Sequence, residues 1–131
     1  MNTGQIESIL LNDPVVARQF AGVFSIDELP PISSDKVCVV NTAPSWVLFG
    51  HWVAIAHEEF FCSFGTDPLS LGLPSLRYNG MWMQSLESDT CGLYVVLYLK
   101  LKCRGYTMLD MQNCFTDDFA LNDLIVCDVF V

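Results

Sequence analysis

The clearest pattern in the chain is an almost unbroken apolar run over residues 91–103, CGLYVVLYLKLKC. A segment of this length that is apolar nearly all round predicts a buried helix. Asp89 or Thr90 can cap its N-terminus, and Gly105 marks its end. Cations that offset the helix dipole cluster near its C-terminus: Lys100, Lys102 and Arg104. We therefore expect one long helix at the centre of the fold.

Three shorter apolar runs predict β-strands, at 36–41 (KVCVVN), 51–56 (HWVAIA) and 60–64 (FFCSF). Only residues 57–59 separate the second run from the third, and this spacing predicts a tight hairpin. Residues 81–85 are a candidate for a further short strand. Together these runs predict a small antiparallel sheet.

Two short helices are predicted before the first strand. One covers 5–11 with Thr3 as its cap. The other covers 14–20, where Asp13 suits the N-cap and a proline the first helical position. Gly, Pro and Ser punctuate residues 21–35, which are therefore expected to form a loop.

The remaining segments are less regular. Residues 65–80 are rich in turn formers and are expected to be mostly loop. Thr107 is expected to cap a helix that runs to Cys114, and residues 121–131 are either helix or strand. The whole pattern predicts an α+β fold in a single domain, 1–131, with a small antiparallel sheet between helices and a central buried helix.

Composition restricts the class of protein. With 52% hydrophobic and 16% charged residues, the chain is expected to fold rather than to be disordered. Lysines interrupt its longest apolar run within about ten residues, whereas a membrane span needs about twenty, so no membrane insertion is expected. The first ten residues lack the basic start and apolar core of a signal peptide. The net charge of −9 argues against nucleic-acid binding, which usually employs a basic face.

Six cysteines are present, at positions 38, 62, 91, 103, 114 and 127. Such a number can form disulfides. Without a secretory signal, however, reduced thiols in an intracellular protein are the expectation. There is no CxxC pair, and neither histidine lies at metal-ligand spacing from a cysteine, so no metal site is predicted.

Cys91 is a candidate nucleophile because it lies at the predicted start of the central helix. Free backbone amides and the helix dipole at that position favour a thiolate. Gly92 would leave room beside the sulfur for a substrate carbonyl. The alternative is a buried cysteine that behaves as a small hydrophobic residue.

Two further side chains have the chemistry to assist a thiol. His51 can deprotonate a nucleophile and later protonate a leaving amine, although a single histidine at a strand edge is also common on protein surfaces. Gln84, seven residues before Cys91, can donate a hydrogen bond to an oxyanion, although a glutamine is more often a surface residue. His57 lies in the predicted hairpin turn beside two glutamates and is expected to be a solvated surface residue.

The order His51, Gln84, Cys91 resembles that of the adenain-like cysteine peptidases, the family of the adenovirus maturation protease. GHW surrounds the histidine, and QSLESDTCGLY contains the glutamine and the cysteine. FAGVFSIDELP, VVNT, GHWVAI and FFCSFG also follow in the family's order, so the resemblance covers roughly residues 1–125. Relatives occur in Maverick/Polinton-type elements and other DNA viruses, and the same clan contains the SUMO-deconjugating proteases.

The resemblance implies a viral-type cysteine endopeptidase with a circularly rearranged papain-like topology. Cys91 would be the nucleophile and His51 the general base, while Gln84 and the Cys91 backbone amide would form the oxyanion hole. Trp52 would pack beside the site, and Gly50 would keep its approach open. The substrates would be viral precursor proteins cut at Gly-containing motifs during virion maturation, in the host-cell nucleus or the assembling particle. The enzyme would be a monomer.

Two departures from the family leave alternatives open. At the position of the family's acidic residue the chain has Cys62, and a thiol orients imidazole poorly. Three nearby carboxylates are candidate substitutes: Glu58, Glu59 and Asp67. Family members use DNA and a disulfide-linked peptide as activators. The acidic charge and the lack of a cysteine between Cys62 and Cys91 argue against both here, and no cofactor is predicted. The alternative functions are a ubiquitin-like-protein deconjugase and a non-catalytic, protein-binding descendant.

Overall fold

A five-stranded mixed sheet forms the centre of the fold in a computed structural model that describes residues 1–47, 50–86 and 88–129. The spatial order follows the chain: β1 (Phe20–Ser25), β2 (Val37–Asn41), β3 (Trp52–Ala56), β4 (Glu59–Phe61) and β5 (Arg77–Tyr78). The pairs β2–β3 and β3–β4 are antiparallel, whereas β1–β2 and β4–β5 are parallel. The α+β class is confirmed, but the prediction of an antiparallel sheet is wrong, because two outer strands that were not predicted pair in parallel with their neighbours.

The inner strands are close to their predicted positions. β3 and β4 form the predicted hairpin, and Ala56 pairs with Glu59 across a two-residue turn. His57 and Glu58 in that turn have φ angles of 49° and 65°, the left-handed conformation that tight hairpin turns require. β4 ends at Phe61, short of the predicted residue 64, and residues 81–85 form no strand.

The first strand was not predicted. Helix α2 (Pro14–Ala17) begins at the predicted N-cap Asp13 but ends well before residue 20. β1 then pairs with β2, and its register shifts between Phe20 and Gly22, where the glycine has a φ of 141°. Gly22, which predicted a loop, instead allows a bulge within a strand.

The helices otherwise follow the sequence pattern. α1 (Thr3–Leu11) is capped by Asn2 rather than by Thr3. α3 (Cys91–Cys103) has Thr90 as its N-cap, and α4 (Met108–Gln112) is capped by Thr107 but stops before Cys114. The ambiguous C-terminal segment is a helix, α5 (Phe119–Val129), and the end of that prediction, 130–131, lies outside the described residues. Two 3-10 turns, η1 (Ile26–Glu28) and η2 (Pro68–Leu71), lie in the connections.

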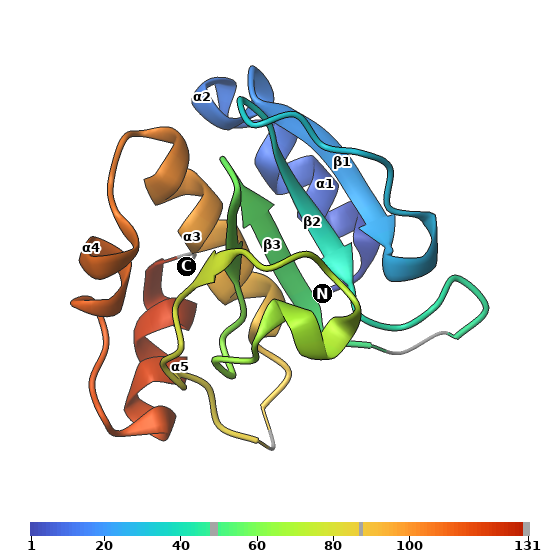
Figure 1. Cartoon of the computed structure of the whole chain (residues 1–131). Helices are drawn as coiled ribbons and strands as arrows, with labels where there is room; N and C mark the ends of the chain where they lie inside the picture. The colour runs from blue at the N-terminus through green and yellow to red at the C-terminus, as the bar shows by residue number, and fades with distance from the viewer. Residues whose placement is uncertain (48–49, 87, 130–131) are drawn as a thin grey trace.

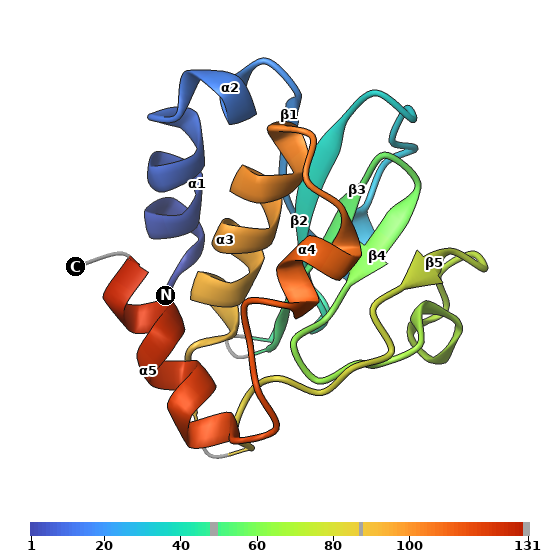
Figure 2. The same ribbon diagram turned by 90° about the vertical axis from the view of Figure 1, so that its left-hand side faces the viewer.

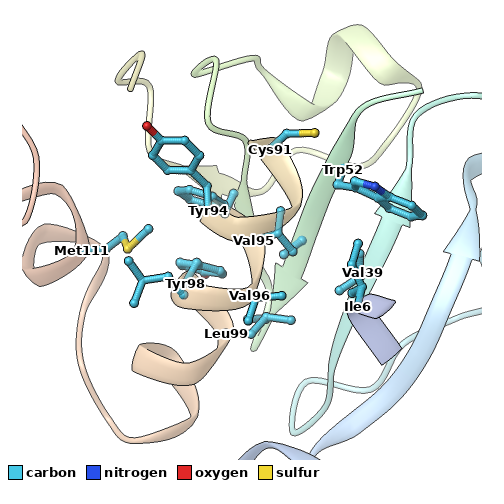
Figure 3. Packing of buried hydrophobic residues seen from close by; sticks show 14 of the residues in the cluster. Ile6, Val39, Trp52, Cys91, Tyr94, Val95, Val96, Tyr98, Leu99 and Met111 are labelled. Atoms are coloured by element: carbon cyan, nitrogen blue, oxygen red, sulfur yellow. The ribbon is translucent and has the colours of Figure 1, made fainter. Parts of the chain in front are cut away.

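Alternating side chains divide the core between the two faces of the sheet. Helices α1 and α3 lie side by side on one face (Figure 1, Figure 2). Eight of the 13 residues of α3 are buried, so the central buried helix is confirmed. Figure 3 shows α3 between the sheet and α4, with Val95 on the sheet side and Tyr98 facing Met111. On the other face, a second cluster that includes Val53, Phe60 and Cys62 is covered by loops. No helix in the described part of the chain is long and apolar enough to cross a membrane.

Candidate active site

His51 and Cys62 meet at one end of the antiparallel hairpin. His51 directly precedes β3 and Cys62 directly follows β4, so strand pairing brings the two residues together. The Nε2 atom of His51 lies 3.3 Å from the Sγ atom of Cys62. Thr42 fixes the histidine backbone, since its hydroxyl accepts from the His51 amide and its own amide donates to the His51 carbonyl. Both side chains line a small cavity of about 220 Å³.

The surroundings of His51 keep its ring uncharged. Phe64 stacks on the imidazole with ring centroids 4.4 Å apart. Burial lowers the pKa of His51 to about 4, because removal from water disfavours the imidazolium. The neighbouring carboxylates are engaged elsewhere: Glu59 binds Tyr98 and Lys102, and Asp67 caps η2. The partner of Nε2 is therefore the Cys62 thiol, and neither Glu59 nor Asp67 replaces it.

Cys91 is the first residue of α3, as predicted, and is 9% exposed. Hydrogen bonds from the backbone amides of Trp52 and Gly92 favour its thiolate, but burial is the larger influence and raises the pKa of Cys91 above its usual value. The expectation of a stabilised thiolate at the helix start is therefore wrong for this state, because desolvation outweighs the amides. The contact with the Trp52 amide places Cys91 beside the residue that follows His51.

Gln84 is buried, so the surface alternative for this residue is wrong. Its Oε1 accepts from the Ser63 hydroxyl, and its Nε2 donates to the Ser88 carbonyl at 2.9 Å. Ser63 follows Cys62, and Ser88 lies just before the start of α3. A glutamine amide carries two N–H donors, and within the part of the chain that the structure describes only one of them is engaged, which leaves the other for a substrate oxygen.

The N-terminal end of α3, where Cys91 lies, is held by the C-terminal helix. The Thr90 hydroxyl donates to Asp123 at 3.1 Å, and the Tyr94 hydroxyl donates to the same carboxylate at 2.8 Å. Sequence reasoning missed Ser63, Phe64 and Asp123. The first two lie within FFCSFG, which already carried the family resemblance, but no local pattern marks Asp123.

Three residues expected near the site have other or more specific roles. Gly50 and Gly92 differ from expectation, and Trp52 makes a more specific contact than predicted. A Cβ atom on Gly50 would overlap Asn41 Oδ1 and Ala43, so this glycine permits a close approach to the end of β2 and the residues after it. A Cβ on Gly92 would lie 3.1 Å from the Met1 sulfur, so Met1 occupies the room expected for a substrate carbonyl. Trp52 is buried, and its indole donates to the Met1 carbonyl at 3.0 Å.

The competing histidine is outside the site. His57 lies at the opposite end of β3, where its Nε2 is 2.7 Å from Gln19 Oε1, so it is half-buried rather than fully solvated. The six cysteines are all free thiols. In the ranges 1–47, 50–86 and 88–129, no group of three or more His, Cys, Asp or Glu side chains is placed to hold a metal ion.

The arrangement can support nucleophilic chemistry at a carbonyl group. It combines the Cys91 thiol and the Gln84 amide, which come from one stretch of the chain, with the His51 imidazole, whose neighbour Trp52 contacts that thiol. No family model matches the chain, and a comparison with curated proteins finds no match.

Proposed function

We propose that the protein is a cysteine endopeptidase of the adenain-like type, with Cys91 as nucleophile and His51 as general base. One observation carries the proposal. The Trp52 amide contacts Cys91 directly beside His51, while Gln84 connects the segment after β4 to the loop before α3. Nucleophile, base and oxyanion donor thereby occupy one end of the sheet. The family resemblance extends the proposal to viral precursor proteins as substrates.

The reaction starts from an uncharged pair. His51 is neutral at pH 7 and Cys91 is a thiol, so proton transfer accompanies the attack on the scissile carbonyl carbon. Because Nε2 contacts Cys62, Nδ1 is the nitrogen that accepts the thiol proton. Gln84 Nε2 and the Cys91 amide donate to the oxyanion. The imidazolium then protonates the leaving amine, the C–N bond breaks, and water hydrolyses the thioester.

A second candidate function is a non-catalytic protein-binding domain. The observation that favours it is the combination of a raised Cys91 pKa, a lowered His51 pKa and a thiol in place of the expected acid. An abandoned active site would have these properties. The two candidates differ in the reactivity that they predict for Cys91.

Alkylation of the native protein with iodoacetamide separates the candidates. Mass spectrometry would locate the modified cysteines between pH 5 and pH 8, with the exposed Cys114 as internal reference. An endopeptidase is expected to label Cys91 about tenfold faster than Cys114, since His51 removes the proton during attack. Labelling should stay fast at pH 5, because His51 remains a base above its pKa of about 4.

Two histidine variants control this experiment. His51→Ala should remove the selective labelling of Cys91, whereas His57→Ala, at the far end of the same strand, should leave it unchanged. Labelling of Cys91 that is slower than that of Cys114 in the wild type, and indifferent to His51→Ala, would support the non-catalytic candidate instead.

A further inference from the structure

A row of aromatic rings leads away from His51. Phe64 stacks on the imidazole at 4.4 Å, and Trp82 meets Phe64 edge-on at 5.4 Å. Phe119 then stacks on Trp82 at 6.2 Å with an interplanar angle of 18°. The rings come from separate parts of the chain, the strand ends, the loop before α3 and the start of α5. The packing therefore continues from the candidate site towards the surface.

The outer end of this row is an exposed apolar hollow. Trp82 and Phe119 are 40% and 38% exposed, and Leu86 is 74% exposed. With Ser85 they line a cavity of about 470 Å³. Single exposed hydrophobic residues are ordinary, but a contiguous apolar concavity marks a binding surface. The volume is ample for one large apolar side chain.

The hollow adjoins the groups that would handle the leaving amine. The Trp82 indole donates to the backbone carbonyl of Gln84, the proposed oxyanion donor, and Phe64 packs on His51. His51 protonates the amine as the C–N bond breaks, so the part of a substrate downstream of that bond lies on the His51 side. A separate cavity of about 510 Å³ begins at Gly50 and Trp52 and is available to the upstream part.

Charge at the hollow restricts the substrate further. Residues 78–99 and 105–131, which supply its walls, contain no Lys, Arg or His. Asp117 and Asp118 are exposed immediately before Phe119, and Asp89 is exposed in the loop that follows Leu86. A basic segment complements this surface, and the attraction is screened by salt.

We propose that the hollow formed by Trp82, Ser85, Leu86 and Phe119 binds the polypeptide segment downstream of the scissile bond. A large apolar side chain of that segment occupies the hollow, and basic residues beside it face the aspartates. This inference rests on the proposed endopeptidase function and names the part of the substrate that selects for cleavage.

Cleavage of a proteome-derived peptide library tests the inference. Peptides whose N-termini and lysine side chains are blocked by reductive dimethylation, which keeps the positive charge of lysine, are incubated with the full chain, and mass spectrometry of the new N-termini reads the residues downstream of each cut. The wild type should enrich Leu, Met or Phe within the first three downstream positions by about tenfold. Lys and Arg should be enriched beside them, and this second preference should weaken in 1 M salt.

Matched variants test whether the hollow is the source of the downstream apolar preference. Trp82→Ala and Phe119→Ala should each flatten the downstream apolar preference while the upstream preference persists. Trp46→Ala and Leu124→Ala remove exposed apolar side chains outside the hollow and should change neither. Cleavage without a downstream preference, or with one that both hollow variants retain, would overturn this inference alone. A wild type that cleaves no peptide would overturn the proposed function and this inference together.

Discussion

The two ends of α3 are equipped very differently, although one helix carries both. At the C-terminal end, Lys100 and Arg104 each lie 2.9 Å from Asp13, and Lys102 lies 3.1 Å from Glu59. At the N-terminal end, Cys91 and His51 are uncharged, and His51 contacts the Cys62 thiol. Both buried carboxylates at the first end have cations as partners, whereas at the second end Cys62 lies where a carboxylate would pair with His51.

This difference separates stability from reactivity. The side chains of Asp13 and Glu59 are 4% and 6% exposed, so removing their partners would leave buried charge unpaired. The pairs fix the helix against the segment before α2 and against the sheet. At the other end, the proposed mechanism requires a buried imidazolium, and His51 there contacts a cysteine rather than a carboxylate. Electrostatics therefore stabilises the C-terminal end of α3, which we call the stable end. It limits the proposed chemistry at the N-terminal end, which we call the reactive end.

Restoring a carboxylate should have the largest effect. Cys62→Asp is expected to raise kcat/KM for a cleaved peptide by about 10²-fold, because the acid orients the imidazole and stabilises the imidazolium. Cysteine enzymes depend on the third residue less than serine enzymes do, so the gain is smaller than the serine-protease loss of about 10⁴. The negative charge also raises the pKa of His51 from about 4, so the acid limb of the pH profile should move upward.

Cys62→Asn provides the matched control, since it has the shape of Asp without the charge. This variant should neither raise kcat/KM nor move the acid limb of the pH profile. Circular dichroism of both variants establishes that each is folded. Equal activity of Asp, Asn and wild type at this position would mean that another group orients His51.

The sequence predicted the parts of the fold that carry strong local patterns. The 91–103 run and the strands of the central hairpin depend on their own apolar residues, and they appear where expected. β1 and β5 do not. Gly22 interrupts the first, and the second is two exposed residues, Arg77 and Tyr78, that become a strand only by pairing with β4. Pairing partners distant in sequence are invisible to a local pattern.

The candidate site likewise has parts that the sequence predicted and parts that depend on contacts between distant residues. Residue order singled out Cys91, His51 and Gln84, and antiparallel pairing accounts for the contact of His51 with Cys62. The thiolate predicted for Cys91 was wrong, because burial by the segments around it raises its pKa, and no local pattern shows this burial. Asp123, which accepts hydrogen bonds from Thr90 and Tyr94 beside Cys91, comes from α5 and could be found only in three dimensions.

Removing the ion pairs of Asp13 at the stable end should lower the free energy of unfolding without changing the reactivity of Cys91. Asp13→Asn keeps a residue suited to the N-cap but loses the ion pairs with Arg104 and Lys100. Because these cations are 41% and 28% exposed on their side chains, we expect a loss of about 2 kcal/mol in the free energy of unfolding, less than for a fully buried pair. Urea titration at pH 7 measures this value, and alkylation of Cys91 should be unchanged.

The same variant has a pH signature. The Arg104 hydrogen bond, with Lys100, holds the pKa of Asp13 well below its usual range. The stability it contributes is therefore complete above the unfolded-state pKa of about 4 and declines as the pH falls below it. The difference between wild type and Asp13→Asn should shrink at pH 3. Asp128→Asn, an exposed position, should stay within about 0.5 kcal/mol of wild type at both pH values.

The smallest effects come from two tyrosine hydroxyls on the same helix. Tyr98 donates to Glu59 at 2.7 Å at the stable end, and Tyr94 donates to Asp123 at 2.8 Å at the reactive end. Tyr98→Phe and Tyr94→Phe should each lower the free energy of unfolding by about 1 kcal/mol, as expected for one buried hydrogen bond. Only Tyr94→Phe should also slow alkylation of Cys91, by about twofold, because Asp123 then holds the Thr90 loop less firmly. If Tyr98→Phe slowed it equally, the two ends would be coupled through the helix and would not be independent.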